Sequence, residues 1–322
     1  MLLGLTGVDA AAQVAWRVGF AAIKIPNDAE PPLLGGVWYP TPAPETRRRL
    51  DGFWQKVAAP GAPVAGSKRG LIVMSHGGGG EFDSHYDTAL ALARAGFVVA
   101  AVSHAGDTST DQSQVLKLWR RPAQLERLVT FMLDSWPAHE RLDVKRVGAF
   151  GFSNGGFTVL VAAGGVPDLA RISGYCEAHP EHDLCRALKT AGVSPGSIVV
   201  PPHAWVGDPR IRAVVVAAPA FGFAFDKAGL TSLRAPMQLW RAADDHHQPN
   251  PWYEEVVRGA LPNPPEYHVV PGADHYAFLA PCSPELAAAA PQICADPPGF
   301  DRTAFHRGFN AEVVRFFSKT LR

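Results

Sequence analysis

The chain has 322 residues, and its 30 basic and 30 acidic side chains give a formal net charge of zero. A balanced charge creates no overall field that would attract nucleic acid or an anionic surface, so we expect neither as a partner. The apolar content of 47% fits a globular domain rather than a disordered chain, and the absence of any run of about 18 apolar residues excludes a transmembrane helix.

The first residues have an ambiguous pattern. Residues 1–8 are mostly apolar and small residues follow them, but no basic residue precedes them. A complete secretory signal has a basic segment at its start. The pattern therefore predicts either a shortened signal or a first helix, and we expect the whole chain, 1–322, to form one domain.

From residue 71 onward, short apolar runs rich in β-branched residues alternate with segments of helical spacing. Predicted strands lie at 71–74, 97–102, 147–150, 211–216, 237–240 and 267–270. Helices are predicted at 86–94, 124–136 and 303–317, and an antiparallel pair near 21–24 and 36–39 opens the sheet. This alternation predicts the α/β class, with a mostly parallel central sheet flanked by helices.

The segment 164–209 interrupts the alternation. It is rich in Gly, Pro and His and shows no strong periodicity. Long segments of this kind within a compact domain tend to be functional. We predict a cap, or lid, over the active site; the alternative is a surface excursion without substrate contact.

The four cysteines fall into two local pairs, Cys176 with Cys185 and Cys282 with Cys294. An even count in loop-like surroundings predicts two disulfides and a periplasmic or secreted protein, the alternative being free thiols in the cytoplasm. Zinc is a further alternative for the first pair, which encloses His179 and His182. Four ligands within ten residues rarely surround one ion, so we predict a disulfide, two solvated histidines and no metal.

Ser153 follows the predicted strand 147–150 and precedes apolar residues suited to a helix, within the sequence Gly-Phe-Ser-Asn-Gly-Gly of residues 151–156. A serine on a sharp turn between strand and helix needs glycine neighbours, because a Cβ there would clash with backbone. Serine is a weak nucleophile that requires a base and an orienting acid. The pattern predicts that Ser153 is a nucleophile.

The base and the acid should follow the two last strands. His275 lies on the loop after strand 267–270, which makes it the predicted base. Asp245 and Asp244 both follow strand 237–240, and the spacing from Ala242 favours Asp245. The order serine, acid, histidine is then the one used by enzymes with this strand-turn-helix nucleophile.

Backbone N–H groups must also stabilise the oxyanion of the tetrahedral intermediate. We predict Asn154 as one donor, since it follows the nucleophile, and Gly78 as the other, with Gly77 as the alternative. Residues at the ends of strands of this class face the substrate. The predicted substrate-binding residues are His76, Gly77, His104, Phe152 and Tyr276.

The chain resembles the dienelactone hydrolase-like branch of the α/β-hydrolases, and within it the esterases similar to platelet-activating-factor acetylhydrolase. The likeness rests on residues 75–80, 103–108, 151–156 and 272–282. It implies a Ser-Asp-His mechanism on carboxylic esters without a cofactor, and several relatives are exported. True dienelactone hydrolases have cysteine at the position of Ser153, so the serine favours ordinary esters over lactones.

The sequence thus predicts a serine carboxylic ester hydrolase that forms an acyl-enzyme and acts on small to medium esters or on polyester or phthalate-type esters. A lipid or phospholipid acyl hydrolase is the alternative within enzymes. A catalytically silent binding protein on the same scaffold is the alternative outside them. Fold resemblance does not choose between substrates.

Overall fold

The apolar runs of the sequence form an eight-stranded sheet in the computed structural model, which describes residues 15–28, 30–50 and 52–322. The sheet order is β1-β2-β6-β5-β7-β8-β9-β10, and its strands are β1 (Arg17–Asn27), β2 (Glu30–Thr41), β5 (Arg69–Ser75), β6 (Val98–Val102), β7 (Leu142–Phe152), β8 (Ile211–Ala217), β9 (Met237–Ala242) and β10 (Glu266–Val270). Strands β5 to β10 run parallel to one another, while β2 runs antiparallel to both of its neighbours, β1 and β6. The predicted fold class is confirmed. The predicted leader, 1–8, lies outside the described residues.

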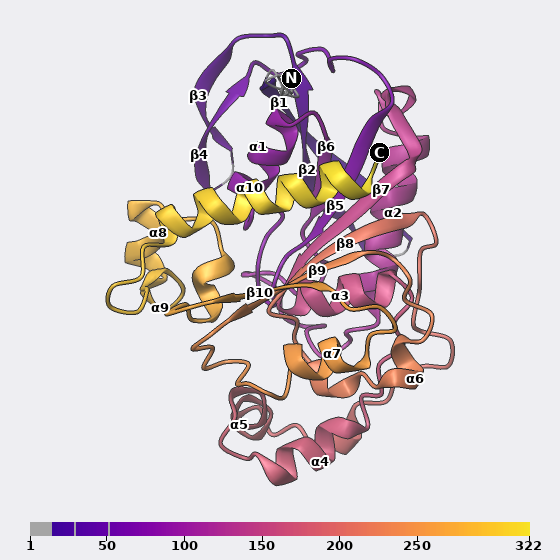
Figure 1. Cartoon of the computed structure of the whole chain (residues 1–322), viewed down its shortest axis with the longest axis vertical. Helices are drawn as coiled ribbons and strands as arrows, with labels where there is room; N and C mark the ends of the chain where they lie inside the picture. Colours follow the sequence, from indigo (N-terminus) through magenta and orange to yellow (C-terminus); the bar gives the residue numbers. More distant parts are fainter. Residues whose placement is uncertain (1–14, 29, 51) are drawn as a thin grey trace, which may run out of the picture.

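Helices cover both faces of the sheet (Figure 1). The longer ones are α1 (Tyr86–Arg94), α2 (Arg120–Asp134), α3 (Asn154–Ala162) and α10 (Arg302–Thr320). In β5, Leu71 and Val73 pack in the core on the side of α2 and α3, whereas Ile72 and Met74 pack on the side of α1 and α10. A strand buried on both faces must be apolar at every position, which explains the uninterrupted apolar runs.

Other short elements complete the chain. They are the hairpin of β3 (Glu45–Leu50) and β4 (Phe53–Ala58), the helices α4 (Arg171–Ala178), α5 (Asp183–Thr190), α6 (Lys227–Leu230), α7 (Glu254–Ala260), α8 (Pro284–Ala289) and α9 (Pro291–Cys294), and the 3-10 turns η1 (His139–Arg141), η2 (Pro195–Ser197), η3 (Gly222–Ala224) and η4 (His275–Phe278). None of the helices in the described part of the chain is long and apolar enough to cross a membrane.

The predicted cap segment, 164–209, holds α4 and α5, which lie together at the lower end of the molecule in Figure 1. Its two ends meet: the Asp208 N–H donates to the Ala162 carbonyl at 2.7 Å. A Cβ placed on Gly207 would lie 3.6 Å from Gly164 Cα. The segment therefore leaves the α/β core and returns to it at one narrow neck, and the N–H groups of Val166 and Asp168 also join it to the core through the Gly229 and Ala224 carbonyls, at 2.9 and 2.8 Å.

Candidate active site

Ser153 occupies the turn between β7 and α3 with φ 55° and ψ −120°, a backbone conformation that residues other than glycine rarely adopt. The turn is tight because α3 starts directly against β5. A Cβ on Gly155 would lie 1.9 Å from the Ser75 carbonyl oxygen, and one on Gly151 would lie 2.1 Å from the Gly155 oxygen. Glycine is therefore required at both positions, and the strained serine is held above the end of the sheet.

His275 and Asp245 meet Ser153 at the carboxyl edge of the sheet. His275 Nε2 lies 3.1 Å from Ser153 Oγ, and His275 Nδ1 lies 2.8 Å from Asp245 Oδ2. Asp245 Oδ1 accepts the backbone N–H groups of His247 at 2.9 Å and Gln248 at 2.7 Å. Both oxygens of the carboxylate are thus used, and the geometry is that of a serine hydrolase triad.

Asp244, the alternative acid, is exposed, and His275 Nδ1 is bonded to Asp245 instead. Its backbone N–H instead donates to the Ala273 carbonyl at 3.0 Å. This bond ties the loop after β9 to the loop after β10. The assignment of Asp245 as the acid stays a prediction, which this placement supports.

The glycine loop after β5 lies against the elbow. A Cβ on Gly77 would lie 3.4 Å from Ser153 Cβ, and one on Gly78 would lie 2.8 Å from the Asn154 side-chain nitrogen. Gly79 donates its N–H to Asp107 Oδ1 at 2.7 Å. The predicted oxyanion donors, Gly78 and Asn154, therefore line the same cavity as Ser153. Asn154 opens α3, where backbone N–H groups have no partner within the helix.

His76 and His104 lie behind the glycine loop, not on the cavity surface. His76 Nε2 accepts the backbone N–H of His104 at 2.9 Å, so its Nδ1 carries the proton and donates to the Gly77 carbonyl at 2.6 Å. Burial, followed by the charge of Arg121, lowers the pKa of both histidines well below the usual value. We had predicted substrate contact for both; their placement instead makes them neutral supports of the loop.

Arg121 of α2 also supports the glycine loop, from the side of the buried histidines. Its guanidinium is buried and contacts the Asp107 carboxylate and the His76 carbonyl, and it donates to Thr158 Oγ1 at 3.1 Å. The other Asp107 oxygen accepts the Gly79 N–H. Arg121 thus connects α2, α3 and the glycine loop.

The cavity above Ser153 has a volume of about 460 Å³. Its lining includes Phe152 and Tyr276, both predicted to bind substrate, and also the glycines of the loop, Leu184 and Ala187 of α5, Phe221, Gln248, Tyr253, Leu279 and Ile293. Helix α5 of segment 164–209 therefore forms part of the wall. The lining is mainly apolar and aromatic around a few polar groups, as is usual for small-molecule sites.

Sequence analysis missed several polar residues of the cavity, among them Gln248, His247 and Asp183. The Gln248 amide lies 3.3 Å from Ser153 Oγ, and its nitrogen, when oriented toward the Ala218 and Pro219 carbonyls, donates at 2.7 and 3.1 Å. His247 Nδ1 pairs with Asp183 Oδ2 of α5 at 2.6 Å. For Gln248 and His247, the position directly after the predicted acid was the available signal.

A second histidine–aspartate pair supports the His275 turn from the opposite side. His306 of α10 contacts Asp87 Oδ2 of α1 through Nδ1 at 2.7 Å and donates from Nε2 to the Ala277 carbonyl at 2.8 Å. Asn310 also donates to Asp87 Oδ2 at 2.7 Å. This pair joins two helices to the turn η4 that carries His275.

Both predicted disulfides are present, Cys176–Cys185 and Cys282–Cys294, and no described cysteine is free. Two groups among the described residues place three metal-ligating atoms together: His179, Glu181 and His182, and separately Glu266, His268 and Glu312. Neither group lines the cavity of Ser153.

Comparison with known proteins agrees with this geometry. Residues 56–192 match the family model described as the dienelactone hydrolase family. The structure is similar to a dienelactone hydrolase from Anabaena variabilis, with 16% identity, a TM-score of 0.55, and coverage of 95% of this chain and 100% of that chain. It is also similar to a ferulic acid esterase from Streptomyces cinnamoneus, with 18% identity, a TM-score of 0.65, and coverage of 97% and 92%. No curated protein matches the chain.

The chain has the α/β-hydrolase fold, and its residues 56–192 match the family model of the dienelactone hydrolases. The structural likeness, at these identities, shows the fold. Together with the family match it supports a hydrolase that acts on esters, the class predicted from the sequence.

Proposed function

We propose that this α/β-hydrolase is a serine carboxylic ester hydrolase, with Ser153 as nucleophile, His275 as base and Asp245 as orienting acid. The observation that carries the proposal is the contact of 3.1 Å between His275 Nε2 and an Oγ held at the strained turn. A strained backbone and an aligned base are both unexplained by folding alone. Together they form the arrangement that activates a serine hydroxyl.

The reaction has two steps. Ser153 Oγ attacks the ester carbonyl while His275 Nε2 takes its proton, and the N–H groups of Gly78 and Asn154 bind the oxyanion. Collapse of the intermediate breaks the ester bond, His275 gives the proton to the leaving alcohol, and an acyl-enzyme remains. Water then gives a proton to His275 and attacks the acyl group, and His275 returns that proton to Ser153 Oγ as the acid is released.

The cavity supports small to medium esters, including aromatic units of the phthalate or polyester type. Phe152, Phe221, Tyr253 and Tyr276 present aromatic side chains to a space of about 460 Å³. Ligand cavities of drug-sized molecules fall in the same range, roughly 300–1,000 Å³. The two disulfides are compatible with export of this enzyme to an oxidising compartment.

The test is hydrolysis of p-nitrophenyl esters from acetate to palmitate by the native chain, Ser153→Ala and the control Ser67→Ala, which alters an exposed serine far from the turn in sequence. We expect the native chain and the control to act on short and medium esters, and Ser153→Ala to be inactive. An optimum at palmitate would favour a lipid hydrolase. Absence of turnover, and of covalent labelling of Ser153 by a fluorophosphonate, would favour a binding protein and contradict the proposal.

A further inference from the structure

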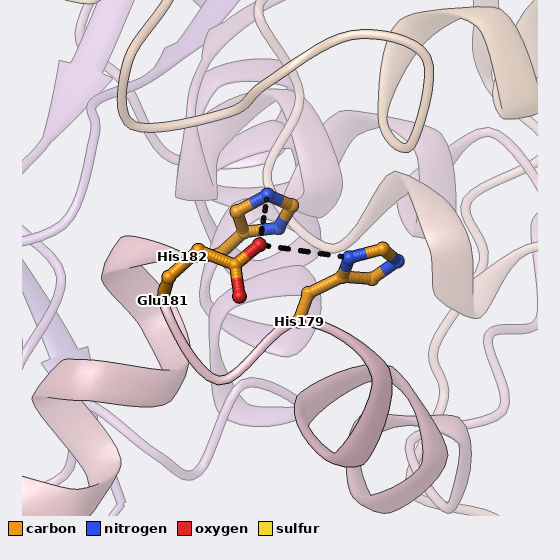
Figure 2. A group of neighbouring side chains, drawn as sticks. All are labelled: His179, Glu181 and His182. Carbon is orange, nitrogen blue, oxygen red and sulfur yellow. Dashed lines mark ion pairs between the residues drawn. The ribbon is translucent and has the colours of Figure 1, made fainter.

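A compact cluster on segment 164–209 lies outside the catalytic cavity. It consists of His179, Glu181 and His182, in the turn between α4 and α5 (Figure 2). Glu181 Oε1 lies 3.8 Å from His179 Nδ1 and 3.4 Å from His182 Nε2. The two imidazole rings are stacked, with centroids 4.7 Å apart. In a tetrahedral zinc site with bonds of about 2.0–2.1 Å, neighbouring ligand atoms lie about 3.3 Å apart. The two distances from Glu181 Oε1 are close to this spacing, and the three ligand atoms all lie within 4.8 Å of one another.

The histidine rings are held by other groups. His182 Nδ1 lies 2.8 Å from the Tyr175 hydroxyl, which itself donates to the Tyr253 hydroxyl at 3.3 Å. A phenol has one proton, so Tyr175 must accept from His182 Nδ1, and this tautomer leaves the Nε2 lone pair directed toward Glu181. Metal-bound histidines are commonly fixed by such a bond from the other ring nitrogen.

The turn itself is restrained. The Cys176–Cys185 disulfide closes the loop that contains all three residues, and Pro180 limits the backbone between them. The His179 ring also packs against Trp252, with centroids 4.4 Å apart. A restrained turn loses little entropy when it binds an ion. With both cysteines oxidised, the thiol ligands that we had weighed from the sequence are excluded.

The local charges leave the cluster free for a cation. Glu181 Oε1 faces the two histidines, and the nearby Arg186 pairs with Asp183 instead. The other cluster differs, because Glu266 is already paired with the Arg315 guanidinium and accepts from Gln238. A protein cation thus occupies the place that a metal would take there.

We propose that His179, Glu181 and His182 form a binding site for a divalent transition-metal ion of the zinc type, with solvent as a fourth ligand. Two imidazoles and one carboxylate suit Zn²⁺ and its borderline neighbours, not Mg²⁺ or Ca²⁺, which prefer oxygen ligands. The ion would crosslink the ends of α4 and α5. Since Asp183 follows His182 and pairs with His247 of the cavity, the ion would also stabilise the wall that α5 forms.

The experiment is Zn²⁺ titration by isothermal calorimetry, on chelator-treated full-length protein whose disulfides are shown to be intact by non-reducing mass spectrometry. We expect one ion per chain for the native protein and for the control His203→Ala, an exposed histidine outside the cluster. We expect saturable binding to be lost in the double variant His179→Ala with His182→Ala. Co²⁺ should give the visible absorption of a tetrahedral site in the same proteins.

Glu181→Gln is a second variant that we expect to fold normally, because the Glu181 side chain is 65% exposed and the change is nearly isosteric. We expect it to weaken Zn²⁺ binding about tenfold or more, since loss of a supporting residue alone often has an effect of roughly that size. Zn²⁺ should raise the Tm of the native protein but not of the double variant. Absence of saturable binding, or binding unchanged in the double variant, would overturn the proposal. Neither Zn²⁺ binding nor the change in Tm depends on ester hydrolysis, so this test can fail independently of the proposed function.

Discussion

Replacement of Asp245 by Asn tests how the histidine of the triad is oriented. Asp245 Oδ1 accepts two backbone N–H groups, from His247 and Gln248, at 2.9 and 2.7 Å. An asparagine in this position must keep its oxygen there, so its NH₂ group faces His275 Nδ1. That nitrogen then has to accept, and the proton of the neutral imidazole moves to Nε2, where it blocks removal of the Ser153 proton.

The expected loss is roughly 10⁴-fold in kcat, the size seen when the tautomer of a triad histidine is inverted. It corresponds to about 5.4 kcal/mol in the activation free energy. The fold should be retained, because both backbone bonds to the side-chain oxygen survive. The assay is kcat on p-nitrophenyl butyrate, with circular dichroism to check folding and the exposed Asp244→Asn as the matched control. A loss under tenfold in Asp245→Asn, or an equal loss in Asp244→Asn, would refute this reasoning.

Two further predictions concern the groups behind the site. Arg121→Met removes one partner of a buried ion pair and leaves the Asp107 carboxylate uncompensated beside the Gly79 N–H. We expect the free energy of unfolding, measured in urea, to fall by about 3–5 kcal/mol, and kcat of the folded fraction to decrease. A change of less than about 1 kcal/mol in the free energy of unfolding would contradict the role assigned to the pair. Burial raises the pKa of Asp87, but hydrogen bonds from His306 and Asn310 outweigh it and hold the pKa below the usual value for an aspartate. This stabilisation is therefore present above that value and is lost as the pH falls through the lowered pKa, so the difference in Tm between the native chain and Asp87→Asn should shrink on acidification; a difference that grows toward low pH would show the opposite linkage.

Much of this fold could be predicted because the burial of its strands determines their composition. Strands β5 to β8 are covered on both sides, so they stand out as apolar runs, and the elbow follows one of them. The hairpin of β3 and β4 was missed because β3 has the sequence Glu-Thr-Arg-Arg-Arg-Leu, which has no buried position and carries no apolar run. Helix α5 was missed as well, since an eight-residue helix shows barely two turns of periodicity.

The residues of the candidate site also fall into those that the sequence could predict and those that it could not. Ser153, Asp245 and His275 could be placed because each follows a strand whose end is visible in the sequence. His76 and His104 were wrongly expected at the substrate, because sequence indicates the edge of the sheet but not whether a side chain points into the cavity or beneath the loop. Gln248 and the Asp183–His247 pair depend on contacts between segments far apart in the chain, which local patterns do not encode.

The narrow neck between Ala162 and Asp208 has a consequence for how this enzyme can change. Because a backbone hydrogen bond joins the two ends of the cap segment, the positions of the strands do not depend on how many residues lie between those ends. A shorter or longer insert closed by the same bond would leave the strands in place and would replace the part of the cavity wall that α5 forms, together with its contact to His247. Substrate range and catalytic chemistry are thereby encoded in separable stretches of one chain, and grafting inserts between these two residues would be a direct route to new ester specificities.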